Sequence, residues 1–189
     1  MTSFLSRHWK ALASVAMVVV VAGLIVVGLA NRSTEFPETE LTVRGPLPQL
    51  TGTDPKTGQT VSTADFAGEP LVVNFWASWC EGCRVEADDI RRFAADRGDD
   101  VQVVGVDLSG DDGAARAFID EFDWEHPSLT GDPRQVGRLS ITAMPTTVYV
   151  WPDGRIAGRD PGEVTYERLQ SVANALDAGP PGGSGDSGL

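Results

Sequence analysis

The sequence predicts an α/β fold with a mixed central sheet and helices on both of its faces. Residues 71–76 and 101–107 are continuous apolar runs typical of buried strands, and a helical pattern follows each of them. Strand, helix, strand and helix in this order imply right-handed crossovers between parallel strands. Residues 146–151 and 155–158 flank a Pro-Asp-Gly turn at 152–154, which predicts an antiparallel hairpin.

Shorter elements precede the first buried strand. Turn-rich residues 52–59, with Leu47 and Leu50 before them, predict a β-hairpin extension at the N-terminal side of the domain. Residues 62–68 predict one turn of helix that directs Phe66 inward.

Three longer helices are predicted. The first covers residues 84–97 and has apolar residues at Val85, Ala87, Ile90, Phe93 and Ala94. Cap-like residues 109–112 open the second, whose core face contains Ala114, Ala115, Phe118, Ile119 and Phe122. The third begins near Thr165 as its cap and places one apolar stripe on the core: Leu169, Val172, Ala173 and Leu176.

The N-terminus predicts a single transmembrane helix. Residues 1–10 contain Arg7 and Lys10 and no acid, and residues 11–30 are uncharged. Twenty helical residues span about 30 Å, which matches the hydrocarbon thickness of a bilayer. A cleavable signal peptide is the alternative because Gly28 and Ala30 are small residues at the right spacing, although such apolar regions usually run only about 7–15 residues. The basic flank predicts a cytoplasmic N-terminus, with all later residues outside the cytoplasmic membrane.

The rest of the chain divides by composition. Polar residues 31–45 predict a linker, residues 46–178 one folded domain, and the Gly-, Pro- and Ser-rich residues 179–189 a disordered tail. After residue 30, 27 acidic residues outnumber the 13 basic ones that remain of the chain's 15. This charge argues against nucleic-acid binding and against a domain lying flat on anionic lipid. We expect a monomer.

The two cysteines of the chain, Cys80 and Cys83, lie between a predicted strand and a predicted helix. The helix N-terminus, with its unpaired N–H groups, favours a thiolate at Cys80, so the pattern predicts a thiol–disulfide exchange site. An inert pair, a structural disulfide and half of a zinc site are the alternatives. A bridge across two residues closes too small a loop to restrain the unfolded chain much, and a structural zinc site needs four ligands.

Three stretches give the chain a resemblance to membrane-anchored thioredoxin-like proteins of the TlpA, ResA and CcmG (DsbE) type. They are Asn74-Phe75-Trp76-Ala77-Ser78-Trp79-Cys80-x-x-Cys83-x-x-Glu86, Met144-Pro145-Thr146-Thr147 and Pro152-Asp153-Gly154. The resemblance covers roughly residues 46–177. It implies a thioredoxin-like fold and no cofactor beyond the redox-active cysteine pair.

The resemblance also implies roles for single residues. Cys80 is the expected exposed nucleophile and Cys83 the buried resolving thiol. Pro145 is the expected cis-proline, which with Met144 and Trp79 would bind the substrate strand. An ordinary proline at a strand edge is the alternative for Pro145.

Acidic residues near the cysteines raise the question of proton transfer. Asn74 stands where cytoplasmic thioredoxins have a buried acid, so it cannot accept the Cys83 proton. We expect Glu86, one turn beyond Cys83, to accept it; a solvated helix carboxylate is the alternative.

Together with Asn74, further residues in and around the motif are expected to tune the reduction potential. Glu81 opposes a thiolate at Cys80, together with the more distant Asp88 and Asp89, whereas Arg84 favours it. Gly82 replaces the proline most often found in the family and loosens the first helical turn. The balance predicts a reductant.

The expected function is reduction of disulfides in exported proteins, such as the haem-site cysteines of apocytochrome c. By resemblance, a membrane-embedded electron donor would re-reduce the chain. An oxidase of the same fold is the alternative. A less favoured one is a copper-binding module of Cys80, Cys83 and His126, because thiolates favour Cu(I); His126 otherwise is expected to be a satisfied surface or edge residue. A peroxiredoxin-like peroxidase is disfavoured by the tryptophans around the cysteines.

Overall fold

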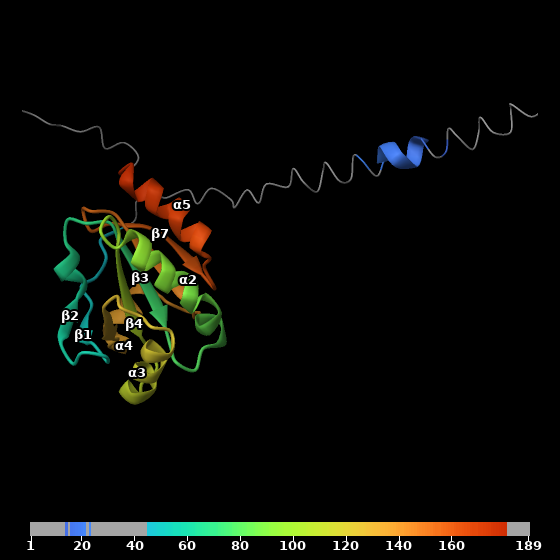
Figure 1. The fold of residues 1–189 in the computed structure, drawn as a ribbon. Coiled ribbons are helices and arrows are strands. Elements are labelled where there is room, and N and C mark those ends of the chain that lie inside the picture. The colour runs from blue at the N-terminus through green and yellow to red at the C-terminus, as the bar shows by residue number, and fades with distance from the viewer. Residues whose placement is uncertain (1–13, 15, 22, 24–44, 181–189) are drawn as a thin grey trace, which may run out of the picture. The chain divides into compact units, whose positions relative to one another are not determined.

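The computed structural model describes residues 14, 16–21, 23 and 45–180 (Figure 1). The chain divides into two compact units, Met1–Glu38 and Thr39–Leu189. The described residues of the first unit are helical, and among the described residues no helix is long and apolar enough to cross a membrane. The predicted segment 1–10, most of the anchor 11–30, linker residues 31–44 and tail residues 181–189 lie outside the described residues. The anchor stays a prediction.

The second unit is built on a five-stranded sheet in the order β5-β4-β3-β6-β7. The central strand is β3 (Leu71–Trp76), which pairs parallel with β4 (Gln102–Asp107) and antiparallel with β6 (Thr146–Val150). The edges are β5 (Ser128–Thr130), parallel to β4, and β7 (Ile156–Pro161), antiparallel to β6. The predicted mixed sheet, its parallel pair and its hairpin are therefore confirmed.

Side chains of β3 alternate between the two faces of the sheet, as the period of a strand requires. Val72 and Trp76 join the core formed with α2 (Glu81–Arg97), α3 (Asp112–Glu121) and α5 (Tyr166–Asp177). Figure 1 shows α2 and α5 side by side, and Arg97 of α2 donates to Gln170 of α5 at 2.8 Å. Asn74, between Val72 and Trp76, consequently points toward α2.

On the opposite face, the described residues form only short helices. Leu71, Val73 and Phe75 pack there against α4 (Pro133–Val136), the 3₁₀ turn η2 (Gly137–Leu139) and η1 (Thr63–Phe66). Helices on both faces were predicted, but the three long helices all contribute to the core of one face. The predicted helical turn near Phe66 is the 3₁₀ turn η1, and Phe66 is partly buried.

The N-terminal hairpin, β1 (Thr51–Thr53) and β2 (Thr60–Ser62), is present as predicted and lies against β5. Asp54 in its turn accepts a 3.1 Å hydrogen bond from the Ser128 N–H. A Cβ at Gly52 would lie 2.2 Å from the Thr130 carbonyl oxygen, so only glycine allows this approach. The hairpin thus covers an edge of the sheet.

Two parts of the structure differ from the sequence prediction. The strand β5 and the helical turns α4 and η2 were not predicted, because each has only three or four residues and too few positions for a period. In α2, Val85 is 62% exposed, whereas Glu86 is buried with Ala87, Ile90 and Phe93. The helix turns its Cys83–Glu86–Ile90 side to the sheet, which leaves Val85 on the outside.

Candidate active site

The cysteines form a disulfide at the first turn of α2. Cys80 is the N-cap of the helix, and its sulfur accepts a 3.1 Å hydrogen bond from the Cys83 N–H. The helix begins at Glu81, three residues before the predicted start, because Cys80 caps it. Cys80 is 6% exposed and Cys83 1% exposed. The nucleophile predicted to be exposed is thus only slightly more accessible than its partner, and its role stays a prediction.

The peptide bond between Met144 and Pro145 is cis, as the resemblance implies. Pro145 packs against Gly82, the second of the two residues between the cysteines. Pro145 follows Cys83 by 62 residues in the sequence (145 − 83), and the fold brings it against Gly82 between the two cysteines. Gly82 therefore does more than loosen the helix as predicted, because a side chain at position 82 would press on Pro145.

Glu86 is buried, 2% exposed, and its carboxylate connects three elements. Its Oε1 accepts a 2.8 Å hydrogen bond from Asn74 Nδ2 of β3, and its Oε2 accepts a 2.9 Å bond from the Val164 N–H before α5. Asn74 Nδ2 also donates to Thr147 Oγ1 of β6 at 3.1 Å. The alternative of a solvated carboxylate is thus wrong for this residue.

Burial raises the pKa of Glu86 from 4.5 to about 7. The hydrogen bonds from Asn74 and Val164 lower the pKa, and the carboxylates of Glu163 and Asp89 raise it. A carboxyl group with a pKa near 7 exchanges a proton readily at neutral pH, which suits an acid–base role. Asn74, buried beside it, supplies a neutral donor where a second acid would compete for the proton.

An apolar groove lies beside the disulfide. Trp79, next to Cys80, is 66% exposed and lines the groove with Met144, next to the cis-proline. The other lining residues are Leu108, Ile141, Thr142 and Ala143. An exposed tryptophan over an apolar groove is a typical contact surface for another protein. The sequence predicted Trp79 and Met144 here but not Leu108 or Ile141, which reach the groove through the tertiary structure.

A hydrogen-bond chain supports the loop before Cys80. The Ser78 N–H donates to Ser109 Oγ at 2.7 Å, and Ser109 Oγ donates to the buried carboxylate of Asp107. Asp107 ends β4 beside Trp76, which ends β3. Burial raises the pKa of Asp107. Sequence reasoning missed these supporting residues, because Ser109 was interpreted as part of a helix cap.

The charged residues expected to tune the cysteines differ in their surroundings. Glu81 is exposed in the first turn of α2. Arg84 instead turns toward α3, where it forms an ion pair with Glu121 and lies 5.1 Å from the Phe122 ring centroid. The positive charge expected to favour a thiolate at Cys80 is therefore partly neutralised by Glu121.

His126 lies apart from the cysteines. Among the described residues, no three His, Cys, Asp or Glu side chains are gathered as a metal site requires, so the copper ligands Cys80, Cys83 and His126 do not come together. The His126 ring packs on Trp124, with 4.6 Å between ring centroids. Both ring nitrogens are buried without a hydrogen-bond partner among the described residues, and burial lowers the pKa to about 4. The expected satisfied histidine is thus not observed.

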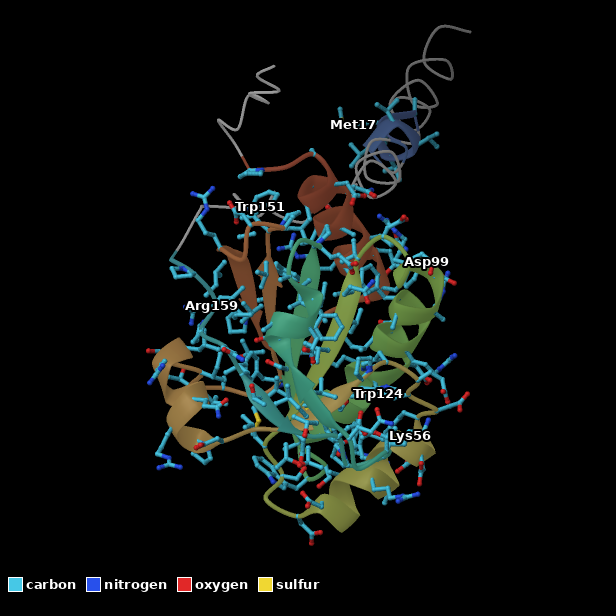
Figure 2. All side chains as sticks on the ribbon, turned by 90° about the vertical axis from the view of Figure 1, so that its left-hand side faces the viewer. Met17, Lys56, Asp99, Trp124, Trp151 and Arg159 are labelled. Atoms are coloured by element: carbon cyan, nitrogen blue, oxygen red, sulfur yellow. A yellow bond between two sulfur atoms is a disulfide. The ribbon has the colours of Figure 1, made fainter. Side chains whose placement is uncertain are left out.

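Lys56 joins the turn of the N-terminal hairpin to the segment that contains Trp124 and His126. Its Nζ donates to the Trp124 carbonyl oxygen at 3.0 Å and to Glu125 Oε1 at 2.8 Å. Figure 2 shows Lys56 and Trp124 near each other at one end of the domain. Trp124 itself is buried, and its Nε1 donates to the Ala87 carbonyl oxygen of α2 at 3.0 Å.

A mixed sheet of this order, with a disulfide at the start of α2 and a cis-proline against it, defines a thioredoxin-like fold. The chain belongs to the Redoxin family, which matches residues 42–176. Both the fold and the family agree with the resemblance found in the sequence.

Similar proteins carry more specific names. The chain is 33% identical over 119 residues to "Thiol-disulfide oxidoreductase ResA" of Oceanobacillus iheyensis, over 62% of each chain. It is 37% identical over 116 residues to "Thiol:disulfide interchange protein DsbE homolog" of Paracoccus denitrificans, over 58% of this chain and 62% of that one. Each match thus spans 62% of the relative's length. A crystal structure of a putative DsbE from Chlorobium tepidum is 27% identical, with a TM-score of 0.63, over 72% of this chain and 99% of that one.

Proposed function

We propose that this protein is an extracytoplasmic thiol–disulfide oxidoreductase that reduces disulfides of exported proteins. The observation that carries the proposal is the Cys80–Cys83 disulfide at the start of α2, with the buried carboxylate of Glu86 one turn beyond it. The names of the similar proteins from O. iheyensis and P. denitrificans support the exchange chemistry.

The reaction begins with the reduced chain. The Cys80 thiolate attacks one sulfur of a substrate disulfide, the substrate S–S bond breaks, and a mixed disulfide forms. The first substrate thiolate leaves and takes a proton from solvent. The position of Cys80 as the N-cap of α2 favours the attacking thiolate, since unpaired N–H groups and the helix dipole point toward it.

The second step needs a proton acceptor for Cys83. Glu86 accepts this proton, and the Cys83 thiolate attacks Cys80 Sγ. The mixed disulfide then breaks, and the second substrate thiolate leaves. Two electrons pass from the cysteine pair to the substrate, and the chain ends with the disulfide of this structure. With a pKa of about 7, Glu86 is partly ionised at neutral pH and so accepts a proton without being a strong base.

The groove beside the disulfide binds the substrate polypeptide. Trp79 and Met144 flank the disulfide and the cis-proline, and the groove between them is mainly apolar. A substrate segment running along the Met144–Pro145 loop places its own disulfide against Cys80. By resemblance to the family, oxidised apocytochrome c, with its haem-site cysteines joined in a disulfide, is a substrate of this kind.

The cellular setting follows from the sequence. The uncharged segment 11–30 anchors the chain in the cytoplasmic membrane, with residues 1–10 inside and the catalytic domain outside. Each turnover leaves a disulfide, so a two-electron donor must restore the dithiol. A membrane-embedded carrier supplies these electrons, and the chain acts as a monomer.

Trapping of substrates in cells tests the proposal. Cys83→Ser cannot resolve a mixed disulfide, so we expect it to accumulate adducts with exported proteins that dithiothreitol releases. Cys80→Ser is the matched control, because it lacks the attacking sulfur and should trap nothing. Equal adducts in both variants, or none with Cys83→Ser, would contradict the proposal.

The direction of exchange is tested separately by equilibration of the purified chain with glutathione. A reductant is expected to have a potential well below that of the strong periplasmic oxidants, about −120 mV. A measured potential near that value would instead favour an oxidase that introduces disulfides.

A further inference from the structure

Glu163 lies over the CxxC motif, although 80 residues separate it from the cysteines. A Cβ at Gly82 would be 2.9 Å from Glu163 Oε1 and 3.3 Å from its Cγ. The same Cβ would be 3.0 Å from Pro145 Cδ. The space that a side chain at position 82 would fill is thus occupied by the Glu163 carboxylate and the cis-proline. This is the position where the resembling proteins most often have proline.

The backbone around Glu163 is held on both sides. The Gly162 N–H donates to the Pro145 carbonyl oxygen at 2.8 Å, and the Val164 N–H donates to Glu86 Oε2 at 2.9 Å. Gly162 has a φ of 97°, which glycine adopts without steric cost. Although the Glu163 side chain is exposed, its backbone is therefore fixed between Pro145 and Glu86.

We propose that Glu163 is a positioning residue for proton transfer, whose carboxylate, held beside Gly82, sets how readily Glu86 accepts the Cys83 proton. This inference rests on the proposed function, in which Glu86 is that acceptor. A nearby negative charge disfavours the ionised form of a carboxyl group, so Glu163 keeps Glu86 protonated to a higher pH.

Few other charged groups act on the pKa of Glu86. The carboxylates of Glu163, before α5, and of Asp89, in α2, raise the pKa of Glu86. The hydrogen bonds from Asn74 and Val164 lower it. Burial raises the pKa of Tyr149 of β6 far above neutral, and the Glu86 charge raises it further. Tyr149 therefore stays uncharged. Asp89 is one turn along the same helix, whereas Glu163 precedes Val164, whose N–H binds Glu86, and its carboxylate lies beside Gly82.

The test follows both thiols of the reduced full-length chain with Ellman's reagent as the disulfide. Attack by Cys80 releases one coloured thiolate, and resolution by Cys83 releases the second. The pH midpoint of the second phase reports the proton acceptor. In Glu163→Gln we expect it to fall on the order of half a pH unit, since an exposed charge is partly screened. Raising the salt concentration should shrink this difference between wild type and variant.

Matched variants separate an electrostatic effect from a structural one. Glu167→Gln removes the same charge from the exposed first turn of α5, and its midpoint should equal that of wild type. In a Glu86→Gln background, Glu163→Gln should cause no further shift. The proposal is overturned if Glu163→Gln matches Glu167→Gln, or if its shift persists without Glu86. If Glu86→Gln itself leaves the wild-type profile unchanged, the role of Glu86 in the proposed function fails as well.

Gly82→Ala tests the spatial part of the proposal. The added methyl should displace the Glu163 carboxylate and shift the midpoint in the same direction as Glu163→Gln. Combined with Glu163→Gln it should add nothing, because the group it displaces has lost its charge. Additive shifts in the double variant would show that Gly82 acts independently of Glu163.

Discussion

Asn74 Nδ2 donates a 2.8 Å hydrogen bond to Glu86 Oε1, which joins the central strand to the CxxC helix. Asn74 is fully buried, and its other hydrogen bond goes to Thr147 Oγ1 at 3.1 Å. An amide at this point leaves Glu86, which belongs to the cysteine helix itself, as the acid buried beside Asn74. The site therefore moves its buried acid from the strand to the helix.

Asn74→Asp should destabilise the protein strongly above neutral pH. It places a second carboxylate against Glu86, and a buried charge without a partner costs about 3–5 kcal/mol. Urea denaturation of the oxidised protein at pH 8 and pH 4.5 measures this. Asn74→Ala, which removes the donor without adding an acid, is the control. A loss for Asn74→Asp that is the same at both pH values would contradict the expectation.

Glu86→Gln should change how stability depends on pH. Between pH 4.5 and 7 the unfolded chain ionises Glu86 while the folded chain keeps it protonated, so rising pH lowers the free energy of unfolding. The total loss is on the order of 3 kcal/mol above pH 7 and zero below pH 4.5. Glutamine removes this contribution, so its stability relative to wild type should rise across the window. Denaturation curves at several pH values check this, and a pH-independent difference would disprove it.

Trp79→Ala should weaken substrate binding with little effect on stability. Its side chain is 66% exposed, so truncation should cost less than about 0.5 kcal/mol of folding free energy. Loss of an aromatic contact in the groove should raise KM for a disulfide-bonded substrate peptide about tenfold. Val85→Ala is the control, because Val85 is similarly exposed but does not line the groove. Equal changes in KM for both variants would show that the groove is not the binding site.

His126→Phe should protect the protein against acid. Burial lowers the pKa of His126 to about 4, so between pH 6.5 and 4 the unfolded chain binds a proton that the folded chain does not. This lowers the free energy of unfolding by about 3 kcal/mol as the pH falls through that window. Phenylalanine removes both ring nitrogens and with them this loss. Melting curves at pH 5 and pH 8 measure it; an advantage of equal size at pH 8 would point to packing alone.

The apolar patterns of the sequence were enough to predict the main elements. Residues 71–76 and 101–107 are short, mainly apolar runs rich in valine, as buried strands are, and Thr165 caps α5 as its side chain suggested. The cysteine spacing and the Met144-Pro145 pair indicated where the site lies. Such local features depend on residues that are adjacent in the sequence, so they can be predicted without knowing the tertiary structure. By contrast, β5 and α4 are too short to leave a pattern, and contacts with the hairpin and the core determine them.

The sequence by itself determined that a CxxC pair begins a helix after a buried strand, and that Glu86 follows one turn later. It could not determine which side of α2 is buried. The burial of Glu86 and the exposure of Val85 both depend on how α2 is rotated on the sheet. Only the tertiary structure brought Glu163 beside Gly82 and, among the described residues, left the His126 nitrogens without a hydrogen-bond partner. The reason is that pKa values depend on desolvation and on nearby charges, and both are set by packing between residues far apart in the chain.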